Sequence, residues 1–418
     1  MKRRIISITL MCSLVLTFTA CAIIKASPPT PTPVTITFVF INDIAKYQPL
    51  ADQFHQLYPH ITVKLEPLRS DRRLDEVLSD VENADAVRIN TFFLNIEFLD
   101  KFMPIDNIVT TDPNFPKDDF ISGSLQALQY KGVQLGIPAG VDPQVVFYEP
   151  KRFEMAGVTP PSADWTVDDL VETALRLDAQ DPSLREKGLF VYGFCSSVQS
   201  TDPLFFVYIF GGKLFDQLPD ATRPTLNDPA NIEAVKWYAS LALDYHILPP
   251  SEEHNYDMYR NISGSNCGYY LQWFDKLGYN LTGAFPSAML PLPKLYDPFN
   301  ISVLDGYFIL KTSTHPQETW QWINFLVSQP DASGKQIPPL LKLINSDLYA
   351  KRVSTDALEI AKRITLNNVI LGLESLQNQQ MGQVIEIFNE AVAEVMTGKI
   401  EARTALDEAQ KRAEDIFK

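Results

Sequence analysis

Val34-Thr35-Ile36-Thr37-Phe38-Val39-Phe40-Ile41 opens the folded part of the chain, and this apolar, β-branched run predicts a strand buried on both faces. From Tyr47 to Tyr58 apolar residues recur at helical spacing, and Pro59 stops this predicted helix. Residues 61–65 then alternate between apolar and polar, which predicts a second strand. A strand, a helix and a strand in so short a stretch form a βαβ unit, and such a unit predicts a parallel sheet.

The same mixture of strands and helices continues along the chain. Residues 84–89 predict a short strand that ends at Asn90-Thr91, and Gly398 breaks the helical C-terminus. We therefore expect an α/β fold with a helical tail, and the length of 418 residues favours two domains. Helices are predicted over 165–177, 232–245, 318–327, 384–395 and 405–416.

The N-terminus has the layout of a secretory signal. Three basic residues, 2–4, precede the uncharged apolar run 5–20. Small residues before Cys21 resemble the lipobox of bacterial lipoproteins, whose cysteine is acylated after cleavage and becomes the new N-terminus. We therefore expect a signal peptide over 1–20, then the lipidated Cys21 and a proline-rich tether up to residue 33. An uncleaved anchor over 5–24 is the alternative, since this stretch is just long enough to span a bilayer.

Charge and cysteine content narrow the class of protein further. The net charge is -15, and removing residues 1–20 leaves 33 basic against 51 acidic residues. This acidic balance argues against nucleic-acid binding, which needs basic patches to neutralise phosphates. Of the four cysteines, Cys12 is lost with the signal and Cys21 is the lipidation site. Cys195 and Cys267 either form one disulfide or are two small buried hydrophobic residues, and we favour the second.

The sequence carries no clear catalytic or cofactor signature. Its five histidines form no metal-binding pair and no C-x-x-C occurs, so neither a metal nor another cofactor is expected. Residues 264–268 look like a nucleophile elbow, but Asn266 holds the central position. Paired carboxylates for glycoside hydrolysis stay open, because Asp and Glu are abundant. Binding is therefore the simpler prediction.

Polar and aromatic residues follow several predicted strands. In open α/β sheets, ligands bind outside the carboxyl ends of the strands, so such residues are candidates for ligand contact. Each candidate also has a structural alternative, such as capping the next helix or packing in the core. The candidate ligand-binding residues are Asn42, Asp43, Asn90, Thr91, Asp142, Tyr270, Trp273, Asp305, Gly306 and Tyr307.

Several segments carry a family resemblance through their collinear order. Phe102-Met103-Pro104-Ile105-Asp106 looks like an L-x-P-L-D segment, and Gly132-Val133-Gln134-Leu135-Gly136-Ile137-Pro138 resembles a G-K-x-Y-G-L-P hairpin. Together these segments resemble the extracellular solute-binding proteins of family 1, the maltose-binding-like receptors of ABC importers. Glu149-Pro150 departs from the Asn-Lys that the family usually has there. The other matching segments are 54–63, 147–165, 211–214, 302–326 and 398–406.

This resemblance implies two α/β lobes of the type II periplasmic-binding-protein fold around a ligand cleft. Ligand would bridge both lobes and favour the closed form, which the membrane permease subunits of an ABC importer would recognise. The resemblance implies a monomeric receptor without enzymatic activity, anchored by lipid outside the bacterial cell membrane. The lobes are expected at 34–141 plus about 303–350 and at about 142–302 plus 351–418, with chain crossings near 139–145, 302–307 and 346–356.

A carbohydrate is the expected ligand. The C–H face of a sugar ring stacks on Trp or Tyr, and its hydroxyls bond to Asn, Asp and backbone groups. The acidic candidates suit a neutral mono- or oligosaccharide better than an anion. Two alternatives remain at this point: a lipid-anchored sensor that presents ligand to a signalling partner, and, less favoured, a tethered glycan-active enzyme.

Overall fold

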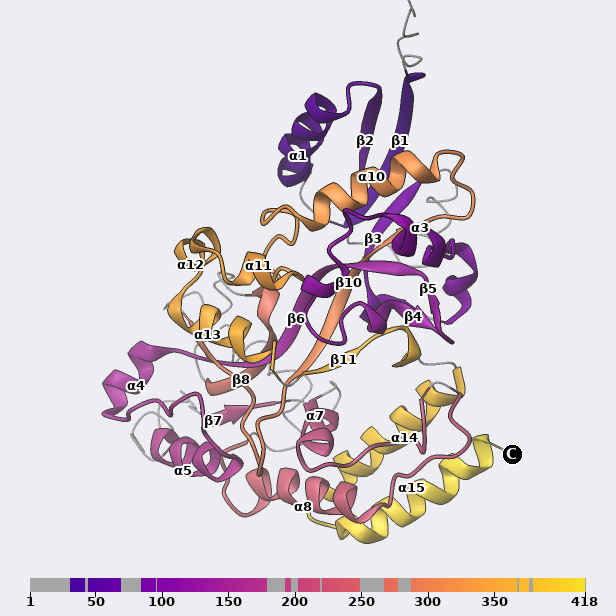
Figure 1. Cartoon of the computed structure of the whole chain (residues 1–418). Coiled ribbons are helices and arrows are strands. Elements are labelled where there is room, and N and C mark those ends of the chain that lie inside the picture. Colours follow the sequence, from indigo (N-terminus) through magenta and orange to yellow (C-terminus); the bar gives the residue numbers. More distant parts are fainter. Residues whose placement is uncertain are drawn as a thin grey trace, which may run out of the picture.

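The computed structural model describes residues 31–41, 44–68, 84–94, 96–178, 192–196, 202–218, 220–248, 267–276, 287–366, 368–375 and 379–417 (Figure 1). Its strands are β1 (Val34–Ile41), β2 (Ile61–Leu68), β3 (Ala86–Asn90), β4 (Gln129–Tyr130), β5 (Val133–Gln134), β6 (Gly136–Tyr148), β7 (Tyr192–Cys195), β8 (Cys267–Trp273), β9 (Ala288–Leu290), β10 (Ile301–Ile309) and β11 (Val369–Leu371). Its α-helices are α1 (Ile44–Leu57), α3 (Asp106–Thr111), α4 (Pro150–Ala156), α5 (Val167–Asp178), α7 (Asp202–Ile209), α8 (Pro229–Leu243), α10 (Pro316–Val327), α11 (Leu341–Ile344), α12 (Asp347–Arg352), α13 (Thr355–Arg363), α14 (Gln379–Val395) and α15 (Ala402–Ile416).

The predicted βαβ unit is present at the start of the fold. Strand β1 pairs in parallel with β2, with Val34 opposite Ile61, and also in parallel with β3. Helix α1 connects β1 and β2, and its Phe54 is fully buried beside Trp322 of α10, with ring centroids 5.1 Å apart. The apolar run of β1 is buried because α1 and α10 both pack in this region.

The expectation of a parallel sheet is wrong beyond β3, because the sheet is mixed. Strand β10 returns antiparallel to β3, and β6 runs antiparallel to β10. The strand order is β2-β1-β3-β10-β6-β8-β7, with β11 beside β10 and β9 beside β6. The sequence shows β6 and β10 only as apolar segments, and apolar content alone does not give the direction of a strand.

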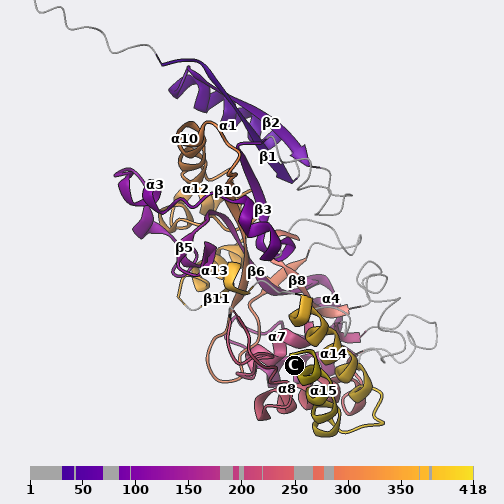
Figure 2. The same ribbon diagram turned by 90° about the vertical axis from the view of Figure 1, so that its right-hand side faces the viewer.

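Strand β6 joins the two halves of the molecule. Its first part, up to Pro143, pairs with β10, whereas Gln144–Tyr148 pairs with β8. Every residue of β6 from Gly136 to Phe147 is buried. Figure 2 shows a first half (β1–β3, α1, α10) and a second half (α7, α8, α14, α15) with β6 and β10 between them.

Three hydrophobic clusters fill the molecule. One centres on β1, α1 and α10 in the first half, and another on α5, α7, α8, α14 and α15 in the second. The third lies between them and takes residues from both sides of the crossing, including Val145, Tyr270 and Phe308. Helix α13 belongs to this middle cluster, where Asp356 accepts a hydrogen bond from the backbone N–H of Met289 at 2.8 Å. The lobe boundaries drawn from the resemblance stay a prediction.

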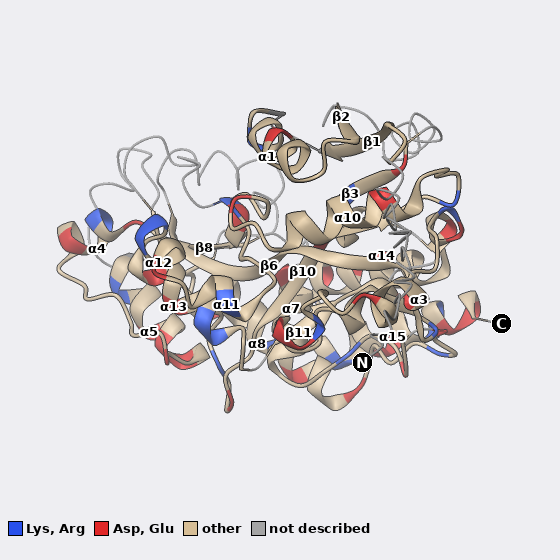
Figure 3. Cartoon of the chain, turned by 45° about the horizontal axis from the view of Figure 1, so that its top comes forward, with Lys and Arg blue, Asp and Glu red and all other residues tan. Residues whose placement is uncertain are grey.

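The predicted helices of the later chain are confirmed. They correspond to α5, α8, α10, α14 and α15, within a few residues at each end. Gly398 has φ +71°, a left-handed conformation that favours glycine, and this explains the break between α14 and α15. Charged residues of both signs lie on outer helices such as α4, α12 and α13 (Figure 3).

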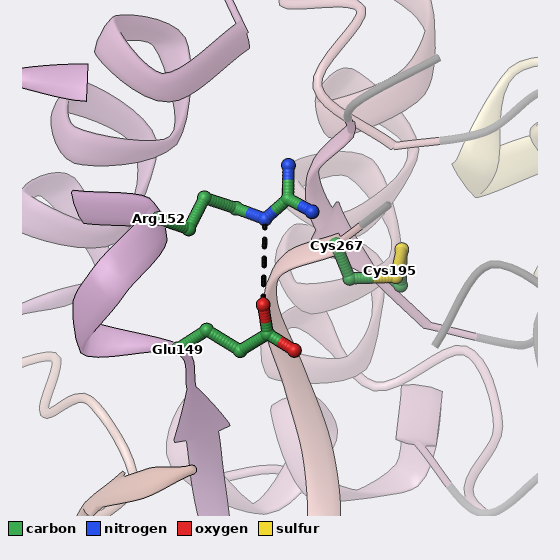
Figure 4. Close-up of a disulfide and its surroundings, with 4 residues drawn as sticks. All are labelled: Glu149, Arg152, Cys195 and Cys267. Carbon is green, nitrogen blue, oxygen red and sulfur yellow. Dashed lines mark ion pairs between the residues drawn. A yellow bond between two sulfur atoms is a disulfide. The ribbon is translucent and has the colours of Figure 1, made fainter. Parts of the chain in front are cut away.

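Glu149-Pro150, which replaces the family's usual Asn-Lys, has a local structural explanation. Pro150 is the first residue of α4, a position where a proline costs no hydrogen bond. The Glu149 carboxylate is buried and forms an ion pair with Arg152, with 3.8 Å between Oε2 and Nε (Figure 4).

The two remaining cysteines form a disulfide, so the expectation of two separate buried thiols is wrong. Cys195 of β7 and Cys267 of β8 are bonded, with their Cα atoms 5.6 Å apart (Figure 4). Both side chains are nearly fully buried, as expected of small hydrophobic residues. The two cysteines lie 72 positions apart in the chain, on neighbouring strands, and sequence spacing alone does not reveal that they meet.

The N-terminal predictions lie outside the described residues. Residues 1–30, which hold the expected signal peptide and Cys21, are not described. Within the ranges that the structure does describe, no helix has the length and apolar character needed to cross a bilayer.

Removing the disulfide should destabilise the fold. Its closed loop of 72 residues restricts the unfolded chain, so Cys195→Ala with Cys267→Ala should lower the free energy of unfolding by about 2–4 kcal/mol. Urea unfolding followed by far-UV circular dichroism measures this loss. As a control, reducing agent should lower the midpoint of the wild-type chain and leave that of the double variant unchanged; equal midpoints for both untreated proteins would contradict the role given to this bond.

Candidate functional site

A cavity of about 700 Å³ lies between the two halves of the molecule. This size falls within the range of about 300–1,000 Å³ that is usual for small-molecule sites. From the first half, its lining comes from the segment after β3, where Thr91–Phe93 form the 3-10 helix η2. From the second half, it comes from α7, α14 and the loop after α7. The lining residues at or near the connecting strands are Trp273, Val303, Leu371 and Gly372.

Phe92 reaches the cavity because Asn90 holds the turn that carries it. The Asn90 side chain caps η2 by accepting a hydrogen bond from the N–H of Phe92 at 2.8 Å. Asn90 in turn donates from Nδ2 to Asp305 at 2.8 Å. The Phe92 ring remains about half exposed at 53%, so it is available to a ligand in the cavity.

Trp273 lies at the end of β8 and contacts aromatic rings from both halves. Its ring centroid is 6.3 Å from that of Phe92 and 5.8 Å from that of Phe205 on α7, and both pairs are edge-on. Strand β8 fixes its backbone because Trp273 pairs with Gln144 of β6. The tryptophan is therefore placed where the crossing strand, the first half and the second half meet.

Thr91 lines the cavity, but its hydroxyl is occupied by the fold. Oγ1 donates to the carbonyl oxygen of Leu371 at 3.1 Å and accepts from the N–H of Leu304 at 3.3 Å. Its side chain therefore ties the end of β3 to β10 and β11.

Asp305 supports the cavity wall through a buried ion pair and does not line the cavity. Its carboxylate accepts hydrogen bonds at 2.8 Å from Arg88 Nε, Asn90 Nδ2 and Gln336 Nε2. Arg88 also donates to the Tyr47 hydroxyl at 2.6 Å and to backbone carbonyls of the 332–336 segment. Burial alone would lower the pKa of Arg88, but Tyr47 and Asp305 hold it above its ordinary value, so the guanidinium is fully charged.

Three further candidates lie in the core. Tyr307 is buried with its ring 6.0 Å from Phe38, and Tyr270 is buried against Phe147 with its hydroxyl 3.2 Å from that of Ser287. A Cβ added to Gly306 would lie 2.5 Å from the ring of Phe308, so glycine is needed there for close packing. None of these three lines the cavity.

Asp142 lies on the crossing part of β6, away from the cavity lining. Its Oδ1 accepts the N–H of Asp275 at 2.9 Å, two residues after Trp273. The pKa of Asp142 is raised well above its usual range, first by burial and next by the negative charges of Asp275 and Asp305, while Lys276 acts in the opposite direction.

The structure thus brings Thr91 and Trp273 to the cavity and places Asn90 directly behind it, while Asn42 and Asp43 lie outside the described residues. That any of these side chains touches ligand stays a prediction. Sequence reasoning missed Phe92, Phe205 and the cavity-facing residues of α14. The apolar residues of 384–395 predict that helix and its buried face, but the earlier residue Met381 and the partly buried Ile385 carry no separate signal.

The described part of the chain contains no group of three or more His, Cys, Asp or Glu side chains able to hold a metal ion. The chemistry available at the cavity is therefore that of aromatic rings, aliphatic groups and a few polar side chains. Such a lining binds an organic solute through stacking and apolar contact.

An α/β molecule in two halves with such a cavity between them is the architecture of a solute-binding receptor. The model of the family described as bacterial extracellular solute-binding protein matches residues 41–332, and the chain belongs to this family. As a member of this family, the chain is an extracellular solute-binding protein, a non-enzymatic receptor. Both the family and the periplasmic-binding-protein-like fold expected from the sequence are confirmed.

Similar proteins share the fold at low sequence identity. An ABC substrate-binding protein of Listeria monocytogenes in complex with cycloalternan is 17% identical, with a TM-score of 0.72, covering 92% of this chain and 98% of that one. The sugar-binding protein MalE of Xanthomonas citri is 16% identical, with a TM-score of 0.72 and coverage of 92% and 97%. A protein of Brucella abortus (strain 2308) described as a binding protein is 22% identical over 400 residues, which cover 89% of this chain and 90% of that protein.

Replacing Asp305 with asparagine tests the ion pair behind the cavity. Asp305→Asn leaves the buried Arg88 charge without its counter-ion and should lower the free energy of unfolding by about 3 kcal/mol in chemical denaturation. The matched control is Asp331→Asn, which breaks an exposed pair with Arg352 and should cost less than about 1 kcal/mol. Equal losses of unfolding free energy in the two variants would show that the buried ion pair contributes no more to stability than the exposed one.

The raised pKa of Asp142 predicts a pH dependence of stability. The folded state keeps this proton where the unfolded state has lost it, so the wild-type chain loses stability as pH rises through that interval. Asp142→Asn keeps the acceptor oxygen and removes the charge. It should be more stable than wild type at neutral pH, and this advantage should shrink toward pH 4 in urea titrations.

Asp216 serves as a control for this titration, because replacing it should change stability at neutral pH in the opposite direction. Hydrogen bonds, first from the Thr222 hydroxyl, lower the pKa of Asp216 to about 2, so its charged form stabilises the fold at neutral pH. Asp216→Asn should therefore destabilise at neutral pH, with the difference from wild type vanishing toward pH 2. An Asp142→Asn variant that loses stability at neutral pH as Asp216→Asn does would refute the buried-carboxyl argument.

Proposed function

We propose that this chain is the carbohydrate or polyol receptor of an ABC importer. The observation that carries the proposal is the aromatic pair at the cavity, Phe92 from the first half and Trp273 from the connecting strand. Aromatic faces stack on the C–H surface of sugar rings, and only one lining side chain in the described part, Glu97, carries a charge. A neutral solute fits such a lining better than an anion.

Similar proteins support this ligand class. The structure from Listeria monocytogenes holds cycloalternan, and a solute-binding protein of Agrobacterium radiobacter K84, which is 22% identical with a TM-score of 0.65, holds ribitol. One ligand is a carbohydrate and the other a polyol. We infer that the cavity of this chain takes a ligand of the same broad class.

Hinge closure is the proposed mechanism. The first half contributes Phe92 and the second half contributes Phe205, so a ligand between them gains contacts from both halves only when these are close. Such a ligand favours the closed form in proportion to its extra contacts there. The closed form would be recognised by the permease subunits. We further propose that Cys21 carries a lipid anchor and that the proline-rich residues up to 33 hold the receptor, as a monomer, at the outer face of the membrane.

Calorimetry on the purified full chain tests the ligand class. A panel of mono- and oligosaccharides and polyols should contain at least one ligand that binds with a dissociation constant in the micromolar range or below. Binding of a peptide or a cation in place of every sugar and polyol would refute the proposal.

Replacing the tryptophan tests the site. Trp273→Ala removes the ring that faces both halves and should weaken binding of the best sugar at least tenfold, which corresponds to about 1.4 kcal/mol. The control is Tyr296→Ala, whose ring is 85% exposed and does not line the cavity, so it should bind as wild type does. An unchanged affinity in Trp273→Ala would remove this residue from the site.

A further inference from the structure

The wall of the cavity in the second half is almost entirely apolar. It is formed by Leu204 and Phe205 of α7, Leu214 and Phe215 of the following loop, and Met381 and Ile385 of α14; we call these six residues the apolar wall. Phe205, Leu214, Phe215 and Met381 are themselves buried in the hydrophobic cluster of the second half. The wall is therefore a rigid part of the core that continues into the cavity.

Polar groups are scarce beside this wall. Among the described lining residues of the second half, Tyr208 contributes a hydroxyl from α7, and burial raises the pKa of that group so that it stays neutral. The other polar lining side chains are Thr91, Glu97, Ser375 and Gln379, none of which belongs to α7 or the loop after it. Gln379 is the first residue of α14, so a polar group lies at the edge of the apolar wall, whereas α7 and the loop after it offer a single hydroxyl.

This difference restricts the part of a ligand that faces the wall. A sugar hydroxyl that is moved from water to an apolar surface loses its hydrogen bonds, and this costs free energy unless the protein replaces them. One tyrosine hydroxyl cannot replace the bonds of several sugar hydroxyls. An alkyl or aryl group in the same position loses no hydrogen bond and gains from leaving water.

Gly382 of α14 adds space beside the apolar wall. It lines the cavity as the fourth residue of the helix, and a Cβ built on it would meet no other atom within 4 Å. A glycine within a helix is unfavourable relative to alanine, and here no close contact requires it. The open space at Gly382, between Met381 and Ile385, leaves room for a ligand group against the helix backbone.

We propose that the ligand is a neutral glycoside with an apolar aglycone, and that the aglycone lies on the apolar wall against Gly382 while the sugar lies toward Trp273 and Gln379. This inference rests on the proposed function, because it takes the sugar part from there. What it adds is the chemical class of the aglycone, which is apolar.

Matched pairs of ligands test the inference. Methyl and phenyl glycosides of glucose, galactose, mannose and xylose, in both anomers, are titrated into the full chain by calorimetry. For the sugar that binds, the phenyl glycoside should bind at least tenfold more tightly than the methyl glycoside, with a more negative heat-capacity change because more apolar surface is buried.

The outcomes separate this inference from the proposed function. Equal or weaker binding of the phenyl glycoside overturns the inference, while sugar binding itself still supports the proposed function. If no pair binds but a free oligosaccharide or polyol does, the inference is again overturned and the function stands. If no sugar or polyol binds at all, both are overturned.

Gly382→Leu places a side chain in the space assigned to the aglycone. It should lower the affinity for the phenyl glycoside at least tenfold and leave that for the methyl glycoside within threefold of wild type. Gly382→Ala is the matched control, because it gives the same gain in helix propensity with little loss of space, and it should keep the phenyl preference. Unchanged phenyl-glycoside binding in Gly382→Leu overturns the inference.

A second variant keeps the test possible if Gly382→Leu does not fold. If thermal melting shows that Gly382→Leu does not fold, Ile385→Ser serves in its place, since Ile385 is only partly buried. It should reduce the preference for phenyl over methyl glycoside at least threefold. The exposed Leu366→Ser, at a position 86% exposed and outside the cavity lining, is its control. An unchanged preference in Ile385→Ser overturns the inference.

Discussion

Strands β6 and β10 pair antiparallel in the middle of the sheet, with β3 of the first half beyond β10 and β8 of the second half beyond β6, and this pairing holds the two halves together. A register shift between Asp305 and Gly306 interrupts this ladder. Such an irregularity re-aims side chains, and Asp305 here accepts hydrogen bonds from Arg88, Asn90 and Gln336. The crossing therefore joins the halves and also supplies the anchor for the cavity wall.

From this crossing, the arrangement of the cavity follows in short steps. Asp305 holds Asn90, Asn90 caps the turn, and the turn presents Phe92. On the other side, β6 pairs with β8 and fixes Trp273 at the end of that strand. The Arg88–Asp305 ion pair thus lies behind the cavity surface, while Phe92 and Trp273 lie on it.

The sequence predicts the local elements well and the long-range contacts poorly. The βαβ unit, α5, α10 and the two C-terminal helices follow from periodicity, Pro59 and Gly398, because these signals act between near neighbours. The direction of β10, the disulfide and the wall formed by α7 and α14 depend on residues far apart in the chain. Their pairing is decided by the tertiary fold, which a single sequence does not show. The family resemblance supplies the architecture that periodicity leaves open.

The candidate site residues show the same difference between local signals and long-range contacts. Thr91 is a candidate because it follows a predicted strand, and Trp273 because it belongs to an aromatic cluster; both line the cavity. Asp305 and Tyr307 are candidates because they interrupt an apolar stretch, yet the first is bound in an ion pair and the second is buried beside Phe38. The sequence therefore predicts the region of the site but not which side chains face the cavity. The direction of each side chain depends on partners, such as Arg88 and Gln336, that lie elsewhere in the sequence.

We propose that a sugar-containing ligand binds between the two halves, at Phe92 and Trp273. A crystal structure of the chain with its tightest-binding sugar or glycoside would show where this ligand lies. We expect the ligand in the cavity, with a sugar ring in contact with Trp273 and both halves contributing contacts. A ligand bound elsewhere, with the cavity holding only water, would contradict the account.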